Sequence, residues 1–192
     1  MNEILEKTAE ALRRRGFDVV CCATGAEARE RVLKVAETAA TIGCGGSMTL
    51  KEIGAMEALA QTGKAPQRRG DVDLFLLSAN ALTADGRIVN IDGNGNRVAA
   101  SVGGPKKVMY VIGRNKIVEG GIDDAIARIK RCACPPNCRR LGKRTPCALT
   151  GACAGGQGCD SPDRICKVTA IFERCTTGVS AKVILVDEDL GY

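Results

Sequence analysis

Histidine and tryptophan are both absent from this chain of 192 residues. Without imidazole there is no Ser-His-Asp or Cys-His nucleophile pair, no histidine metal ligand and no histidine proton shuttle. Acid–base chemistry therefore falls to Asp, Glu, Lys, Tyr or Cys side chains. Aromatic residues are also scarce, with 3 Phe and 2 Tyr. We therefore expect a core of Val, Ile, Leu, Ala and Cys.

Long hydrophobic runs are missing as well. No stretch approaches the ~18 apolar residues of a membrane span. Residues 1–7 lack the apolar stretch that follows a basic start in a signal peptide. The length and the 45% hydrophobic content suit one globular domain over residues 1–192. We expect a soluble, cytoplasmic protein.

The excess of positive charge is small, because 28 Lys and Arg stand against 22 Asp and Glu, a net charge of +6. Its strongest cluster, in residues 139–144, has no interleaved aromatics and does not resemble a stacking platform for single-stranded nucleic acid. We therefore expect a small anionic ligand as partner, with neither nucleic acid nor a membrane.

The odd count of 11 cysteines requires an explanation. A disulfide scaffold is typical of small secreted chains and does not suit a reducing compartment. The cysteines are concentrated between Cys132 and Cys175. This clustering indicates metal.

Apolar patterning predicts the fold class. Helical periodicity marks residues 2–15, 25–38, 49–61 and 122–129, and apolar runs predict strands at 17–22, 39–42, 74–77 and 108–112. Asp85-Gly86 predicts a hairpin within a stretch of short extended pieces at 80–104. Two further strands are expected at 167–172 and 181–186. The alternation favours an α/β fold with a mainly parallel sheet, into which residues 132–166 form a cysteine-rich insertion without apolar periodicity.

A glycine-rich loop joins a predicted strand to a predicted helix. Gly43, Gly45 and Gly46 would let backbone N–H groups approach a ligand, and the start of a helix favours negative charge. Ser47 and Thr49 add hydroxyl groups, so the loop is a candidate cradle for phosphate or carboxylate. It matches no nucleotide motif, neither the P-loop nor the dinucleotide fingerprint. The alternative is a tight turn followed by a helix cap.

Short polar side chains crowd into residues 80–97. They would line the mouth at the carboxyl ends of the sheet, where open α/β sheets bind ligands. The alternative is ordinary turn chemistry, which uses the same residue types. Arg97 is the least turn-like member and the best candidate for gripping an anion. The set comprises Asn80, Thr83, Asp85, Asn90, Asp92, Asn94, Asn96 and Arg97.

Four cysteines, Cys147, Cys153, Cys159 and Cys166, are separated by five, five and six residues. Four thiolates are enough to hold zinc or an iron–sulfur cluster, and nearby basic residues would favour thiolates. No Cys-x-x-Cys is present, although zinc ribbons and ferredoxin loops usually contain one. Three interpretations stay open: an iron–sulfur or other metal site, structural zinc, or thiols without metal.

Several long strings resemble the LUD-domain family, the lactate-utilisation proteins once grouped as a domain of unknown function. The strings, in order along the chain, are GCGGSMTLKEIG (43–54), SANALTADG (78–86), NIDGNGNRVAA (90–100), GPKKV (104–108) and GRNKIV (113–118). The resemblance extends from the first predicted helix to Tyr192. It implies a three-layer α/β/α fold similar to ribose-5-phosphate isomerase, glucosamine-6-phosphate deaminase and CoA-transferases.

The resemblance also implies a role in oxidising L-lactate or a related hydroxy acid beside iron–sulfur partner proteins. Its strings mark a ligand site for a carboxylate or phosphate. The candidate binding residues are Gly43, Gly45, Gly46, Ser47, Thr49, Asn80, Thr83, Gly93, Gly95, Asn96, Arg97, Asn115 and Lys116. The candidate acid–base groups are Glu52, Asp85 and Asp92.

The cysteine segment also resembles one branch of the family. Its cysteines Cys147, Cys153, Cys159 and Cys166 are the candidate ligands of a [4Fe–4S] cluster or, alternatively, zinc. In that branch two residues separate the second and third cysteines, whereas here residues 154–158 intervene. Cys132, Cys134 and Cys138 stand where the branch has small residues. We interpret these three as substitutions and not as ligands. Cys21, Cys22 and Cys44 are interpreted as small core residues.

Two other functions stay open. The chain could be a non-catalytic subunit whose metal segment is structural and which docks redox partners. Turnover by the isolated chain distinguishes that role from an enzyme. Fold analogy alone suggests an isomerase or ligase acting on a phosphorylated substrate.

Overall fold

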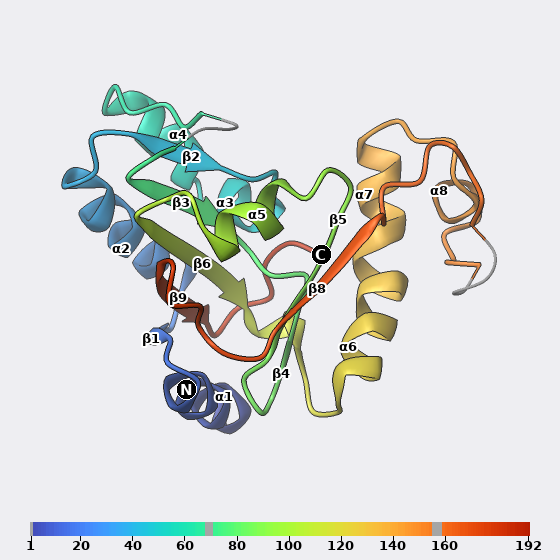
Figure 1. Ribbon diagram of the computed structural model, residues 1–192, viewed down its shortest axis with the longest axis horizontal. Helices are drawn as coiled ribbons and strands as arrows, with labels where there is room; N and C mark the ends of the chain where they lie inside the picture. Colours follow the sequence, from blue (N-terminus) through green and yellow to red (C-terminus); the bar gives the residue numbers. More distant parts are fainter. Residues whose placement is uncertain (1, 68–70, 155–158) are drawn as a thin grey trace.

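The computed structural model describes residues 2–67, 71–154 and 159–192. At its centre lies a five-stranded sheet whose neighbouring strands are all parallel, in the order β1-β9-β6-β3-β2 (Figure 1). These strands are β1 (Asp18–Cys22), β2 (Ile42–Cys44), β3 (Leu74–Leu77), β6 (Lys107–Gly113) and β9 (Ser180–Val186). The prediction of an α/β fold with a mainly parallel sheet is confirmed.

Helices cover both faces of this sheet, as the continuous apolar sequences of β3 and β6 require. One core packs the sheet against α2 (Gly25–Glu37), α3 (Met48–Glu52) and α4 (Ala55–Gln61). The other core contains side chains of α1 (Glu3–Arg14) and α5 (Asn96–Val102). The layered arrangement expected of the fold class is therefore present.

A second sheet of four strands, in the order β7-β4-β5-β8, lies beside the first. Its strands are β7 (Ile117–Val118), β4 (Ala81–Thr83), β5 (Ile88–Asp92) and β8 (Val168–Phe172). The predicted hairpin is confirmed, because β4 and β5 pair antiparallel across Gly86, whose φ is +90°. The sequence predicted this hairpin and a strand at 167–172, but not that they pair. The antiparallel addition of β8 to β5 joins segments far apart in the chain.

Two predicted elements are wrong in detail. The helix expected over residues 49–61 is two helices, because Gly54 adopts a left-handed conformation with φ +69° and ends the first one. Residues 96–102, expected within extended pieces, form α5 instead. Its amino terminus is held by the carboxylate of Asp92, which accepts hydrogen bonds from the backbone N–H groups of Arg97 and Val98.

The cysteine-rich segment is also more ordered than its sequence suggests. The helix α6 (Ile122–Arg128) runs on through a π-helical turn, η2 (Ile129–Ala133), into α7 (Cys134–Arg140), as Figure 1 shows. A short helix α8 (Pro146–Thr150) follows. Residues 132–140 are therefore a helical extension and not an irregular insertion. Cys134 and Cys138, four residues apart on α7, are both buried.

Every helix in the described parts of the chain is too short or too polar to cross a lipid bilayer.

Candidate functional site

A cavity of about 710 Å³ opens where three strands end. Cys44 at the end of β2, Ser78 directly after β3 and Asp92 at the end of β5 all contribute to its wall. Residues of α7 and of the segment 162–167 form the opposite wall. The cavity thus lies at the carboxyl ends of the strands, where open α/β sheets bind ligands.

The glycine-rich loop forms one side of this cavity. Ser47 caps α3, because its hydroxyl oxygen accepts a hydrogen bond of 3.2 Å from the Leu50 backbone N–H. A Cβ atom at Gly45 would lie 2.5 Å from Cγ of Arg97, whereas a Cβ at Gly46 would meet no protein atom within 4 Å. The loop can therefore cap the helix and still bind a ligand. The absence of a side chain at Gly45 lets Arg97 pack against the loop, and the absence of one at Gly46 leaves space in the cavity beside its backbone.

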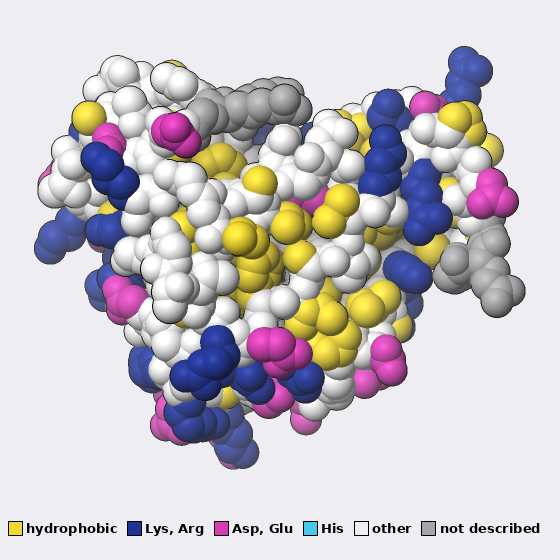
Figure 2. Space-filling model, in the orientation of Figure 1, with side chains coloured by type: hydrophobic (Ala, Val, Ile, Leu, Met, Phe, Trp, Pro, Cys, Tyr) yellow, Lys and Arg dark blue, Asp and Glu magenta, His cyan; other side chains and the backbone are white. Residues whose placement is uncertain are grey.

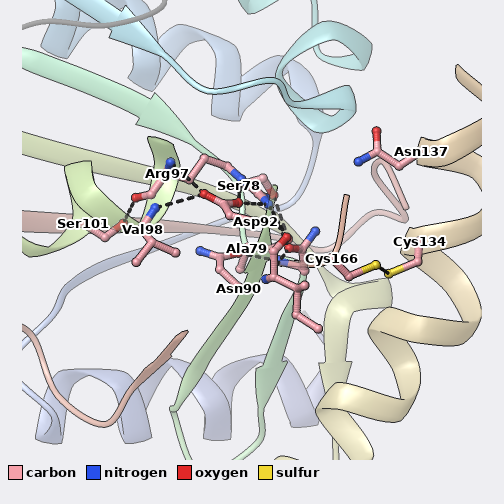
Figure 3. Close-up of polar contacts among 12 residues, drawn as sticks. Ser78, Ala79, Asn90, Asp92, Arg97, Val98, Ser101, Cys134, Asn137 and Cys166 are labelled. Atoms are coloured by element: carbon pink, nitrogen blue, oxygen red, sulfur yellow. Dashed lines mark hydrogen bonds and ion pairs between the residues drawn. The ribbon is translucent and has the colours of Figure 1, made fainter. Parts of the chain in front are cut away.

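Arg97 is fixed by hydrogen bonds within the protein (Figure 3). Its Nε donates to Oδ1 of Asp92 at 2.7 Å, and its Nη2 donates to Oδ1 of Asn80 at 3.0 Å and to the Ile91 carbonyl at 2.9 Å. Asp92 is almost fully buried and also accepts the two backbone N–H groups that start α5. Asp92, a predicted acid–base group, therefore orients Arg97 and the start of α5.

Lys116 is buried in the wall of the cavity, with only 3% of its surface exposed. Its Nζ donates to Oγ1 of Thr49 at 2.7 Å and to Oγ of Ser78 at 2.9 Å. Burial lowers the pKa of Lys116 to about 7, with smaller contributions from the positive charges of Arg128 and Arg97. This amine is therefore partly neutral at pH 7.

The structure brings most of the predicted binding residues to the cavity. Those in its wall are Gly45, Gly46, Ser47, Asn80, Gly93, Asn96, Arg97 and Lys116, and the predicted acid–base group Asp92 lies there as well. Thr49 does not line the cavity, but its hydroxyl oxygen accepts a hydrogen bond from Lys116, which does. Gly43 and Gly95 do not line the cavity, and a Cβ at Gly43 would lie 2.7 Å from the ring of Phe75.

Two further predicted residues hold the end of the chain beside the cavity. Asn115 donates to the Gly191 carbonyl and accepts from the Leu190 N–H, and the carboxylate of Glu52 accepts from the Gly191 N–H. Neither Asn115 nor Glu52 lines the cavity wall. Both side chains thus position the chain end.

Thr83 and Asp85 lie apart from the cavity, at the turn between β4 and β5. The Thr83 hydroxyl donates to Asp85, and Asp85 pairs with Arg15 and Arg87 at 3.0 Å each. These contacts tie the hairpin to the end of α1. Thr83 and Asp85 therefore do not belong to the cavity site.

Most of the positive charge at the cavity comes from residues that the sequence did not nominate as ligand contacts. Seven Lys or Arg but only three Asp or Glu line the wall. The seven are Lys51, Arg97, Lys116, Arg140, Lys143, Arg164 and Lys167. Figure 2 shows Lys and Arg side chains gathered over the part of the surface that carries α7. The basic run at 139–144 was the sequence signal for part of this wall.

The four predicted metal-binding cysteines also come together. Cys147, Cys153, Cys159 and Cys166 line one small pocket of about 20 Å³, with Lys130 and Arg164 beside them. Within residues 2–67, 71–154 and 159–192, however, no three Cys, Asp or Glu side chains are close enough to hold a metal ion. The thiols and the neighbouring cations have the chemistry of a thiolate-bound metal site. The thiols are, however, not arranged closely enough to surround a metal ion.

Of the other cysteines, some lie in or against the core and Cys134 contacts a predicted metal ligand. Cys22 and Cys44 are buried core residues and Cys21 packs against the core, as the sequence predicted. Burial raises the pKa of Cys44 to about 12. Cys134, interpreted as a simple substitution, instead lies with its Sγ 3.4 Å from Sγ of Cys166 (Figure 3).

Comparison with known proteins agrees with the resemblance found in the sequence. The crystal structure of a DUF162 family protein from Deinococcus radiodurans superimposes with a TM-score of 0.58 over 96% of each chain. Its sequence identity is 14%, so this likeness concerns the fold alone. None of the curated proteins matches the sequence. The LUD domain family model matches residues 5–186, nearly the whole chain, and the protein therefore belongs to the LUD domain family.

Proposed function

We propose that this LUD-domain protein binds a small organic anion, a carboxylate or a phosphate, in the 710 Å³ cavity and takes part in oxidising L-lactate or a related hydroxy acid. The observation that carries the anion-binding proposal is the excess of seven cationic side chains over three acidic ones in the wall. The volume is within the range of about 300–1,000 Å³ that is typical of ligand pockets.

The cations divide into an inner and an outer group. Arg97 is paired with Asp92, so its charge is largely balanced inside the protein. Arg140, Lys143 and Lys167 on the opposite wall take part in no ion pair within the described residues. These outer cations would attract the anion, and the Gly46 backbone, Ser47 and Asn96 would supply neutral hydrogen-bonding groups near the strand ends.

The hydroxy-acid part of the proposal rests on membership of the family. Oxidation of a hydroxy acid to a 2-oxo acid releases two electrons, and a [4Fe–4S] cluster on Cys147, Cys153, Cys159 and Cys166, when bound, would carry them one at a time to a partner protein. The four thiols share one pocket with Lys130 and Arg164 beside it, which favours this assignment, but they would have to move closer together to enclose a cluster. Cys166 lines both this pocket and the anion cavity, so such a cluster would adjoin the ligand.

A second function is favoured by the surface of the same segment. Leu149 on α8 is 78% exposed and Leu141 after α7 is 46% exposed, beside the basic wall. A zinc ion in place of the cluster would make this segment a structural platform. The chain would then be a non-catalytic subunit that docks redox partners.

The first experiment measures binding of L-lactate, pyruvate and inorganic phosphate by thermal denaturation and calorimetry. We expect stabilisation by at least one of them, about 2.7 kcal/mol when the ligand is at one hundred times its Kd. Gly46→Val, which places a side chain in open space at the wall, and Arg140→Glu should weaken binding. Lys34→Glu on α2, away from the cavity, is the charge-matched control and should bind as wild type. Binding that survives Gly46→Val and Arg140→Glu unchanged would contradict the site.

The second experiment measures iron, acid-labile sulfide and zinc in protein purified without oxygen. About four irons and four sulfides with a broad band near ~400 nm indicate a [4Fe–4S] cluster. Cys147→Ser and Cys153→Ser should lose it, whereas Cys175→Ser, outside both pockets, should keep it. Reduction of a dye by L-lactate then tests turnover. One zinc and no colour would favour the docking subunit.

A further inference from the structure

Lys116 differs from the other cations of the cavity in how its amine is held. Its two hydrogen-bond partners are hydroxyl groups, and each hydroxyl carries a single proton. The Thr49 hydroxyl donates its proton to the Leu190 carbonyl at 3.2 Å, and the Ser78 hydroxyl donates to the Ala79 carbonyl at 3.4 Å. Both oxygens therefore act as acceptors toward Nζ, at 2.7 and 2.9 Å.

This arrangement suits a neutral amine. A neutral primary amine has two N–H bonds and one lone pair, and here both N–H bonds are used by Thr49 and Ser78. The lone pair is then the one remaining feature of the nitrogen, on a side chain that forms part of the cavity wall. An amine held in this way is prepared to act as a nucleophile.

The surrounding charges act in the same direction. The charged groups that face Lys116 are Arg128, Arg97 and Glu52. The Glu52 carboxylate accepts the backbone N–H of Gly191, and none of the ion pairs in the described ranges includes Lys116. Two nearby guanidinium groups and burial thus disfavour the ammonium form.

We propose that Lys116 is a catalytic residue that forms an imine with the carbonyl group of a small 2-oxo acid bound in the cavity. The ligand class follows from two requirements of the site. The basic wall favours an anionic group such as a carboxylate, and a nucleophilic amine needs a carbonyl carbon. A small 2-oxo acid carries both groups on adjacent atoms. This inference rests on the proposed anion site and specifies its ligand.

The reaction needs no oxidant or reductant. The Nζ lone pair attacks the carbonyl carbon, a C–N bond forms, and the carbonyl electron pair moves to oxygen, which takes up one proton lost from nitrogen. The C–O bond then breaks as nitrogen loses its second proton to the departing oxygen, so amine and ketone yield imine and water. Added borohydride transfers hydride to the imine carbon and leaves a stable secondary amine on the lysine.

The test treats the full chain with pyruvate and sodium borohydride, followed by intact mass and peptide mapping. We expect one stable adduct per chain, on the peptide that contains Lys116. L-Lactate, which has no carbonyl carbon at the 2-position for the amine to attack, should give none. Lys116→Arg should lose the adduct, and Lys34→Arg, an exposed lysine on α2, should retain it. Excess L-lactate should slow trapping in the wild-type protein, a measurement that does not depend on a variant that folds.

The outcomes separate this inference from the proposed function. Stabilisation by pyruvate without an adduct, or adducts spread over surface lysines, would overturn the role of Lys116 and leave the anion site intact. Absence of stabilisation by any of the three anions would overturn both. Loss of the adduct in Lys116→Arg with pyruvate binding retained would support the covalent role over a purely electrostatic one.

Discussion

The Sγ atoms of Cys134 and Cys166 lie 3.4 Å apart although 32 positions separate these residues in the chain. Cys134 is the first residue of α7, and Cys166 lies shortly before β8. Both line the anion cavity, and Cys166 also lines the small pocket of thiols. The pair therefore marks the wall that the two cavities share.

This proximity predicts a specific cross-link. Metal-free protein treated with glutathione disulfide should form a Cys134–Cys166 disulfide and release two glutathione thiols. In the chain-entropy view, closing a loop of this length stabilises the fold by about 3–4 kcal/mol. Peptide mapping under non-reducing conditions detects the bond. Exposed Cys132 on the same helical segment is the internal control and should carry only mixed disulfide. A mixed disulfide on Cys166 with Cys134 left free would contradict the prediction.

Arg97→Ala should destabilise the fold strongly, because it leaves the buried carboxylate of Asp92 without its cation. Loss of one partner of a buried pair costs about 3–5 kcal/mol. Urea denaturation measures the free energy of unfolding of each variant. Combined with Asp92→Asn, the loss should be smaller than the sum of the two single losses, because the residues are coupled. A loss below about 1 kcal/mol for Arg97→Ala would show that the pair is weak.

Stability should depend on pH through Lys116, whose pKa falls from 10.5 to about 7 on folding. Between these values the unfolded chain binds a proton on this amine that the folded chain lacks. The free energy of unfolding should therefore rise with pH from about 7 upward, by at most about 1.4 kcal/mol per pH unit. Below pH 7 the cost of burying the charge is fully present.

The measurement compares wild type with Lys116→Met by urea denaturation from pH 6 to 9. Met has a similar length and no charge, so all other titrating groups cancel in the difference. The free energy of unfolding of the wild type should increase relative to that of Lys116→Met as the pH rises. A difference that stays flat over this range would mean that Lys116 keeps its ordinary pKa.

Gly86 at the hairpin turn should resist substitution. Its φ is +90°, and a Cβ there would lie 2.7 Å from the carbonyl carbon of Ala11 in α1. Gly63, with φ +75° and no atom within 4 Å of its Cβ, is the matched control. Gly63→Ala should cost only the ~1–2 kcal/mol of the left-handed conformation, and Gly86→Ala clearly more. Equal losses in urea denaturation would show that α1 yields to the added methyl group.

Local features of the sequence determined the elements around the site. Continuous apolar runs marked β3 and β6, because a strand covered on both faces needs apolar side chains at every position. Asp85-Gly86 marked the hairpin, and the glycine-rich loop marked the boundary before α3, where Ser47 is the cap. These are short-range effects, in which the residue type limits backbone conformation or exposure directly.

Local features did not predict α5, which spans only seven residues and depends on a carboxylate from the preceding strand. They also missed the second sheet, because the pairing of β5 with β8 joins distant segments. In the cysteine segment, residues 132–140 lack the apolar periodicity of a helix, so the sequence did not predict that α6 continues into α7.

Tertiary structure alone decided which candidates share a site. The sequence nominated Lys116 only as a ligand contact. Its hydrogen bond to Thr49, 67 positions away, and the lowering of its pKa by burial beside Arg128 arise only in the folded chain. Packing also brought Cys134 into contact with Cys166. It placed Thr83 and Asp85 at the turn of the hairpin, away from the cavity. Sequence sets residue type and local conformation, whereas desolvation and hydrogen bonds between distant segments arise only after the chain has packed.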